Sequence, residues 1–109
     1  MDLNEYQVLA QKTAQYPGKG KDLVYPALGL NGEAGEVADK LKKVMRDNHG
    51  EFDPERREDL AYELGDVLWY IADLAIELGY SLDTIAHMNI KKLSSRARRG
   101  KLGGNGDHR

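Results

Sequence analysis

The chain has 109 residues, of which 31% are charged, yet its formal net charge is only −2. This length predicts one domain, and the near balance of charge argues against a partner that is a nucleic acid polymer, because such proteins usually carry a basic excess. The chain contains no cysteine, which excludes disulfides and thiolate metal sites. It shows no secretory signal, and its longest apolar run is residues 67–72, so we expect a cytoplasmic protein that does not bind membranes.

The first half of the chain predicts two helices. Residues 2–16 place apolar side chains on one face, as a short amphipathic helix does, and the segment PGKGKD at 17–22 then breaks the chain. A second helix should begin near Tyr25, because Pro26 suits the first helical turn. It should end near the segment DNHG, with Gly50 as its terminator.

The second half predicts two more helices. Asp53 followed by Pro54 is a strong start for the third helix, which should end at Gly79. Ser81 should cap a fourth helix that runs to about Arg99. The fold class is therefore all-α with four helices and no strand.

The last ten residues have a different composition from the rest of the chain. Residues 100–109 contain four glycines and no apolar pattern, which predicts a flexible tail. The folded domain should therefore cover residues 1–99.

The third helix combines an apolar stripe with a row of acids. Seven acidic residues and no lysine or arginine occur between positions 58 and 90. Glu63 and Asp66 are three residues apart and so share one helical face, and Glu33 and Glu36 repeat this spacing on the second helix. If the two helices pack side by side, these four carboxylates should meet.

The apolar stripe of the third helix consists of Leu60, Leu64, Val67, Ile71, Leu74 and Leu78. The remaining acids of this helix, Asp59, Asp73 and Glu77, are expected to be surface or interface residues.

Four neighbouring carboxylates predict a metal site. Their mutual repulsion costs several kcal/mol when they are partly desolvated, and a divalent cation removes that cost. Because all four ligands are oxygens, the cation should be Mg²⁺, with Mn²⁺ as a possible substitute. The alternative is a solvated acidic face, in which Glu36 pairs with Lys40 four residues later and no metal is needed.

The fourth helix carries the positive charge that the third lacks. Asn89 lies on its inner face, and Lys92 and Arg96 flank it. Such a group suits a phosphate chain, since arginine binds phosphate in a bidentate manner and lysine supplies a point charge. Considered alone, this helix is explained better as a basic last turn that the helix dipole favours.

Taken together, three segments carry a resemblance to a known family. LGLNGEAGEVADKLKKV, ELGDVLWYIADLA and NIKKLSSR resemble the MazG-like branch of the all-α nucleoside triphosphate pyrophosphohydrolases. The family pattern of EExxE followed by ExxD falls on Glu33, Glu36, Glu63 and Asp66, and its first acid is replaced by Gly32.

The resemblance implies an enzyme that cleaves nucleoside triphosphates between the α- and β-phosphates, releasing the monophosphate and pyrophosphate. It implies that the four spaced acids hold Mg²⁺ and that Glu36 helps to deprotonate the attacking water. Lys92 and Arg96 would then hold the β- and γ-phosphates, and Asn89 would bind a phosphate oxygen or the sugar. The family also forms dimers and tetramers, so we expect a helical bundle assembled from copies of this chain, as a homotetramer rather than a homodimer.

Two alternatives remain open from the sequence. The same fold and metal can serve a specialised enzyme, acting on dUTP or on phosphoribosyl-ATP, because base selection depends on the shape of the pocket. The chain can also be a helical oligomerisation module with a cation site and no activity. We expect Trp69 to lie in a subunit interface rather than against a base.

Overall fold

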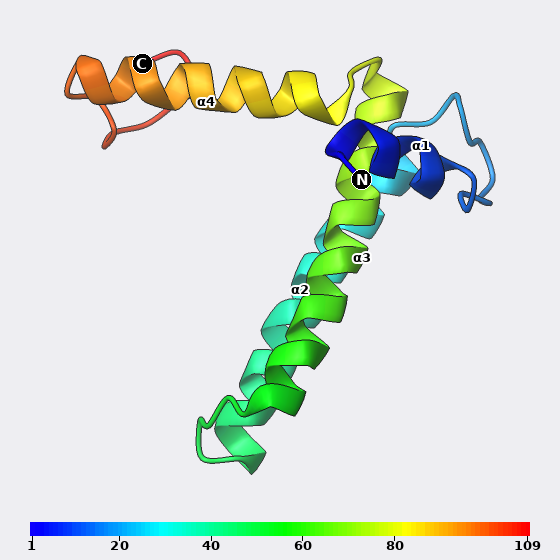
Figure 1. The fold of residues 1–109 in the computed structure, drawn as a ribbon, viewed down its shortest axis with the longest axis vertical. Helices are drawn as coiled ribbons and strands as arrows, with labels where there is room; N and C mark the ends of the chain where they lie inside the picture. Colours follow the sequence, from blue (N-terminus) through cyan, green and yellow to red (C-terminus); the bar gives the residue numbers. More distant parts are fainter.

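The computed structural model describes residues 1–109 and contains four α-helices and no strand, which confirms the predicted fold class. α2 and α3 lie side by side as a long antiparallel hairpin, α1 packs near one end of α3, and α4 extends away from that end (Figure 1). None of the four helices has the length and hydropathy that a membrane span requires. The helices are α1 (Leu3–Gln11), α2 (Val24–Asp47), α3 (Pro54–Leu78) and α4 (Leu82–Arg98).

The predicted caps set the boundaries of α3 and α4. The Asp53 carboxylate accepts the backbone N–H of Arg56 at 3.0 Å, and the Ser81 hydroxyl accepts that of Thr84 at 3.1 Å. Gly79 ends α3 with a φ of 84°, a left-handed conformation that only glycine adopts without strain. These local signals therefore placed both helices to within about one residue.

The first helix is shorter than predicted, because α1 ends at Gln11 and not near residue 16. The Thr13 hydroxyl donates to the Ala10 carbonyl at 2.7 Å, and so competes with the backbone bond that would continue the helix. The same hydroxyl accepts the indole N–H of Trp69 at 2.7 Å. A contact with α3 therefore holds Thr13 in a turn that helical periodicity did not reveal.

The buried core lies at the corner where α1, α3 and α4 meet. Its centre consists of Ala72, Ala75 and Leu82, which are nearly inaccessible to solvent. The predicted apolar stripe of α3 is only partly buried, since Leu64 is 58% exposed and Leu78 is 52% exposed. No residue of the predicted stripe is fully buried, and the buried residues of α3 are instead Ala72, Asp73 and Ala75.

Gln7 joins α1 to this corner through three hydrogen bonds. Its side-chain amide donates to the carbonyls of Ala72 at 3.2 Å and Tyr80 at 3.0 Å, and its carbonyl accepts the backbone N–H of Leu82 at 3.0 Å. Gln7 itself is buried. The side chain thus binds the Tyr80 carbonyl and the Leu82 N–H of the α3–α4 connection, and ties both to the Ala72 carbonyl within α3.

Replacing Gln7 with leucine is expected to lower the free energy of unfolding by about 2 kcal/mol, because buried backbone groups then lose their partners. Urea unfolding followed by circular dichroism measures this loss. Gln11→Leu, at an exposed position of the same helix, is the control. Equal stability of the two variants would contradict a structural role for the Gln7 amide.

Two acids of α3 hold the loop that follows α1. Asp73 is buried and accepts a hydrogen bond from the hydroxyl of Tyr16. Glu77 accepts from the same hydroxyl at 3.2 Å and from the backbone N–H of Gly20 at 2.7 Å. Burial and the two nearby carboxylates raise the pKa of Tyr16 well above its usual value. The sequence left Asp73 as a surface or interface residue, but in the structure it is buried within the chain and anchors this loop.

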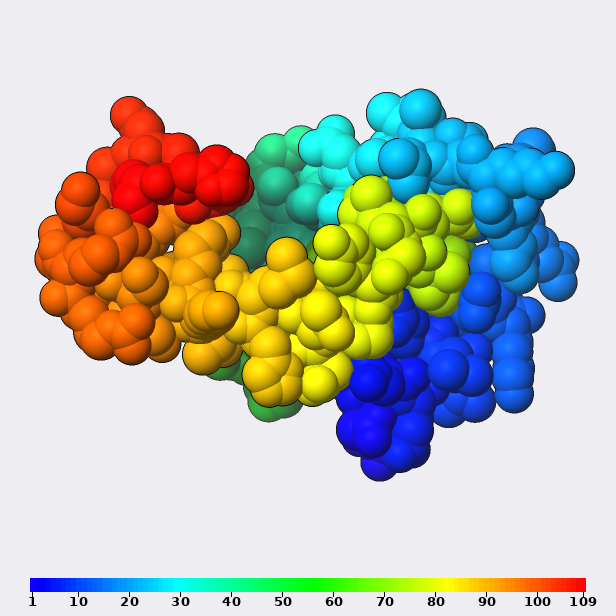
Figure 2. Space-filling model, turned by 90° about the horizontal axis from the view of Figure 1, so that it is seen from above, coloured from blue at the N-terminus to red at the C-terminus, as the bar shows by residue number.

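The overall shape is open for a chain of this length. The radius of gyration is 16.8 Å, whereas roughly 13 Å is expected for a compact domain of this size. Figure 2 shows α4 and the C-terminal segment projecting to one side of the other helices. Apolar side chains remain exposed on all the long helices, including Leu28, Leu41, Tyr62, Leu64, Met88 and Ile90.

Candidate active site

Three of the four predicted metal ligands come together between α2 and α3. Glu33 from α2 and both Glu63 and Asp66 from α3 each offer a carboxylate oxygen, and these oxygens lie within 4.8 Å of one another. We call these three residues the acid cluster. Glu36 lies one turn further along α2, is exposed and is outside the cluster, so its part in metal binding stays a prediction.

A close approach of the two helices supports this arrangement. The Tyr70 ring of α3 rests against Gly29 of α2, where any Cβ atom would collide with it. Gly29 therefore lets α2 and α3 pack tightly one turn of α2 before Glu33. The absence of a side chain at this one position helps to set the distance across which the carboxylates face each other.

The acid cluster is electrostatically unfavourable on its own. Burial raises the pKa of Glu33 above its usual value, and the neighbouring charges of Asp66, Glu63 and Glu36 raise it further. A crowded carboxylate with a raised pKa, as at Glu33, favours either a proton or a nearby cation. Since every donor is a hard oxygen, the set fits Mg²⁺ or Mn²⁺ better than softer metals.

One cation of the chain contacts the cluster. The ammonium of Lys40 lies 2.9 Å from Oε1 of Glu63. The alternative of a solvated acidic face paired Lys40 with Glu36 on the same helix, but the structure pairs Lys40 with Glu63 across the hairpin. The sequence suggested that the acids of the third helix have no basic partner. In the structure, Lys40 of α2 is a partner for one of them.

A hollow of about 360 Å³ adjoins the acid cluster on one side. Glu33 and Asp66 line it together with Thr13, Trp69 and Tyr70. The Trp69 and Tyr70 rings meet edge to face, with 4.9 Å between their centroids. Trp69 therefore lies beside the acids in this chain, and its expected place in a subunit interface stays a prediction.

The predicted phosphate-binding residues lie elsewhere in the chain. Asn89, Lys92 and Arg96 belong to α4, which makes no close backbone contact with α2. α4 leaves the α2–α3 hairpin at the end opposite the loop that joins these two helices (Figure 1). The structure thus gathers the acids but does not bring the basic residues of the same chain to them.

The C-terminal segment folds back on the basic face of α4. The Lys92 ammonium lies 3.0 Å from the Asp107 carboxylate, and the Arg96 guanidinium donates to the Gly106 carbonyl at 3.0 Å. Lys92 and Arg96 hold the pKa of Asp107 below its usual value. Arg96 is only 5% exposed, and its Nε has no hydrogen-bond partner. Residues 100–109 contain no helix or strand; their flexibility stays a prediction.

Comparison with known proteins identifies the family. The model of the MazG nucleotide pyrophosphohydrolase domain matches residues 26–100, which include the acid cluster and the basic residues of α4. The chain is also 47% identical, over 114 aligned positions that cover the full length of both proteins, to the Gene 37 protein of Mycobacterium phage L5. No solved structure matches the chain. The chain therefore belongs to the MazG nucleotide pyrophosphohydrolase family.

Proposed function

We propose that this protein is a Mg²⁺-dependent pyrophosphohydrolase that converts nucleoside and deoxynucleoside triphosphates to monophosphates and pyrophosphate, as part of nucleotide-pool housekeeping in the cytoplasm. The observation that carries this proposal is the meeting of Glu33, Glu63 and Asp66 within 4.8 Å in a chain of the MazG family. Family membership supports the reaction class, and the oxygen ligands support the choice of metal.

The chemistry follows from the placement of the carboxylates. Mg²⁺ held by the acid cluster supplies charge neutralisation for the phosphates. We assign to Glu36, which is exposed one turn from Glu33, the role of accepting a proton from the attacking water. As that water's oxygen bonds to phosphorus, the bridging P–O bond between the α- and β-phosphates breaks and pyrophosphate leaves. No side chain needs to form a covalent bond with the substrate.

The hollow beside the cluster suits the nucleoside part of the substrate. Its volume of about 360 Å³ lies within the range of roughly 300–1,000 Å³ usual for ligand pockets. Trp69 and Tyr70 offer aromatic surface to a base, and Glu33 and Asp66 line the same hollow. A base bound there would place its phosphates toward the metal ligands.

We further propose that the active unit is a homo-oligomer, a tetramer rather than a dimer. The open shape and exposed apolar side chains of a single chain support this assembly, since a second copy can bury them. It also offers a role for Asn89, Lys92 and Arg96, because α4 of one copy can bring them to the acid cluster of another. The Asp107 carboxylate would have to give way to the substrate phosphates.

Product analysis tests the proposed reaction. Incubation with a panel of normal and modified nucleoside triphosphates, dUTP included, is expected to yield monophosphate and pyrophosphate in equal amounts with Mg²⁺ or Mn²⁺. EDTA is expected to abolish the reaction, because the acid cluster then has no divalent cation. Release of orthophosphate would contradict cleavage between the α- and β-phosphates. A folded protein that is silent with every nucleotide would overturn the proposal.

A further inference from the structure

Lys40 occupies an unusual place beside the acid cluster. Its ammonium reaches across the hairpin to Glu63, whose side chain is only 15% exposed. No other lysine or arginine forms an ion pair with Glu33, Glu63 or Asp66. The one positive charge in contact with the cluster thus comes from the same helix that supplies Glu33.

The surroundings of Lys40 are acidic on several sides. Its ammonium contacts Glu63, and Asp59 lines the same hollow as Lys40. A lysine ammonium is positively charged at neutral pH, so this contact neutralises part of the negative charge of the acid cluster. Lys40 thus neutralises negative charge at one edge of the acid cluster, as a bound divalent cation would at its centre.

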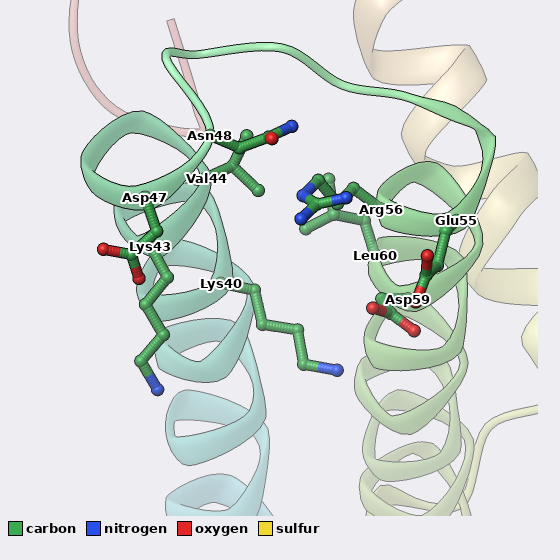
Figure 3. A pocket seen from close by; sticks show the side chains of 9 residues that line it. All are labelled: Lys40, Lys43, Val44, Asp47, Asn48, Glu55, Arg56, Asp59 and Leu60. Atoms are coloured by element: carbon green, nitrogen blue, oxygen red, sulfur yellow. The ribbon is translucent and has the colours of Figure 1, made fainter.

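Lys40 also has room to move away from Glu63. It lines a hollow of about 310 Å³ between the end of α2 and the start of α3, and Asp59 lies on the opposite wall. Figure 3 shows the Lys40 side chain extended from α2 toward the side of α3 that carries Asp59. The Lys40 side chain is 36% exposed, so a rotamer change would bring its ammonium toward Asp59 without disturbing a packed core.

We propose that Lys40 is the internal counter-ion of the acid cluster: it holds Glu63 when no divalent cation is bound, and turns toward Asp59 when the metal takes Glu63. This proposal rests on the proposed metal site. It gives Lys40 two separable effects. The ammonium stabilises the metal-free fold, and it competes with the metal for the same carboxylate.

Lys40→Met removes the charge and keeps most of the side-chain volume. Without metal, the melting temperature of this variant is expected to fall by about 2–4 °C, because the cluster loses its counter-ion. Its affinity for Mn²⁺, measured as free Mn²⁺ by electron paramagnetic resonance, is expected to rise about threefold to tenfold. Added Mn²⁺ should therefore raise its melting temperature more than it raises that of the wild type.

Two matched variants serve as controls. Lys42→Met removes the same charge from the same helix, but Lys42 pairs with Asp39 on the outer face and should leave Mn²⁺ affinity unchanged. Lys40→Arg keeps the charge and should retain the metal-free stability of the wild type. In a Glu63→Gln background, Lys40→Met should no longer tighten Mn²⁺ binding, because the shared carboxylate is gone.

The outcomes separate this inference from the proposed function. If Lys40→Met binds Mn²⁺ as tightly as the wild type, or more weakly, the competition is overturned while the metal site stands. If neither the wild type nor any variant binds Mn²⁺, both the inference and the metal-dependent function are overturned. Tighter binding by Lys40→Met alone supports the counter-ion role.

Discussion

Replacing Glu63 with glutamine is expected to lower nucleotide turnover at least about 100-fold while the four helices remain folded. Glutamine has the shape of glutamate but no negative charge, so it is a poor ligand for a hard divalent cation. Glu63 also lies among charged groups of the proposed site, since the carboxylates of Glu33 and Asp66 and the ammonium of Lys40 all lie close to it.

This prediction is tested by steady-state rates together with thermal unfolding of the same samples. The fold should persist, because the substitution removes one of three mutually repelling charges and this relief offsets the loss of the ion pair with Lys40. Glu58→Gln, at an exposed position of α3 outside the acid cluster, is the matched control and should keep wild-type turnover. Full activity of Glu63→Gln would rule out the acid cluster as the catalytic metal site.

Mixing two inactive variants is expected to restore activity, if α4 serves the acid cluster of another copy. Glu63→Gln disables the metal site and Arg96→Met disables the phosphate site, so each homo-oligomer should lose at least about 100-fold in turnover. In a random equal mixture, an intact cluster meets an intact α4 in about a quarter of the sites, so about a quarter of wild-type activity should return.

The mixing experiment requires that the subunits exchange. The two variants are therefore unfolded together, refolded and sized by light scattering before turnover is measured. The same refolding applied to each variant alone is the control. If a single chain supplied both halves of its own site, every refolded mixture would stay as inactive as its parents. Arg96 would then have to act within its own chain, against the separation of α4 from the acids.

The sequence was a good guide wherever structure depends on neighbours along the chain. Asp53, Gly79 and Ser81 cap helices through bonds to residues a few positions away, so their effect is visible in the sequence. The sequence failed at the end of α1, where the hydroxyl of Thr13 binds both Ala10 and the distant Trp69. A contact across 56 residues leaves no periodic signal.

The candidate site shows the same division. The three-residue spacing of Glu63 and Asp66 places both on one face of any α-helix, and it made their shared role predictable. The spacing of Glu33 and Glu36 was equally regular, yet only Glu33 reaches the cluster. In a helix of 3.6 residues per turn, positions three apart differ in direction by about 60°. The rotation of α2 relative to α3 therefore decides whether Glu33 or Glu36 points toward α3.

By itself, the sequence determined the number of helices, the caps of α3 and α4 and the two acidic pairs, because local hydrogen bonds and helical periodicity set these features. Only the tertiary structure decided that Glu33 meets Glu63 and Asp66, that Lys40 pairs across the hairpin, that Asp73 is buried and that α4 leaves the acid cluster. Each of these depends on how far one helix slides and rotates against another. Packing at contacts such as Gly29 against Tyr70 fixes those two quantities, and residues far apart in the chain supply it.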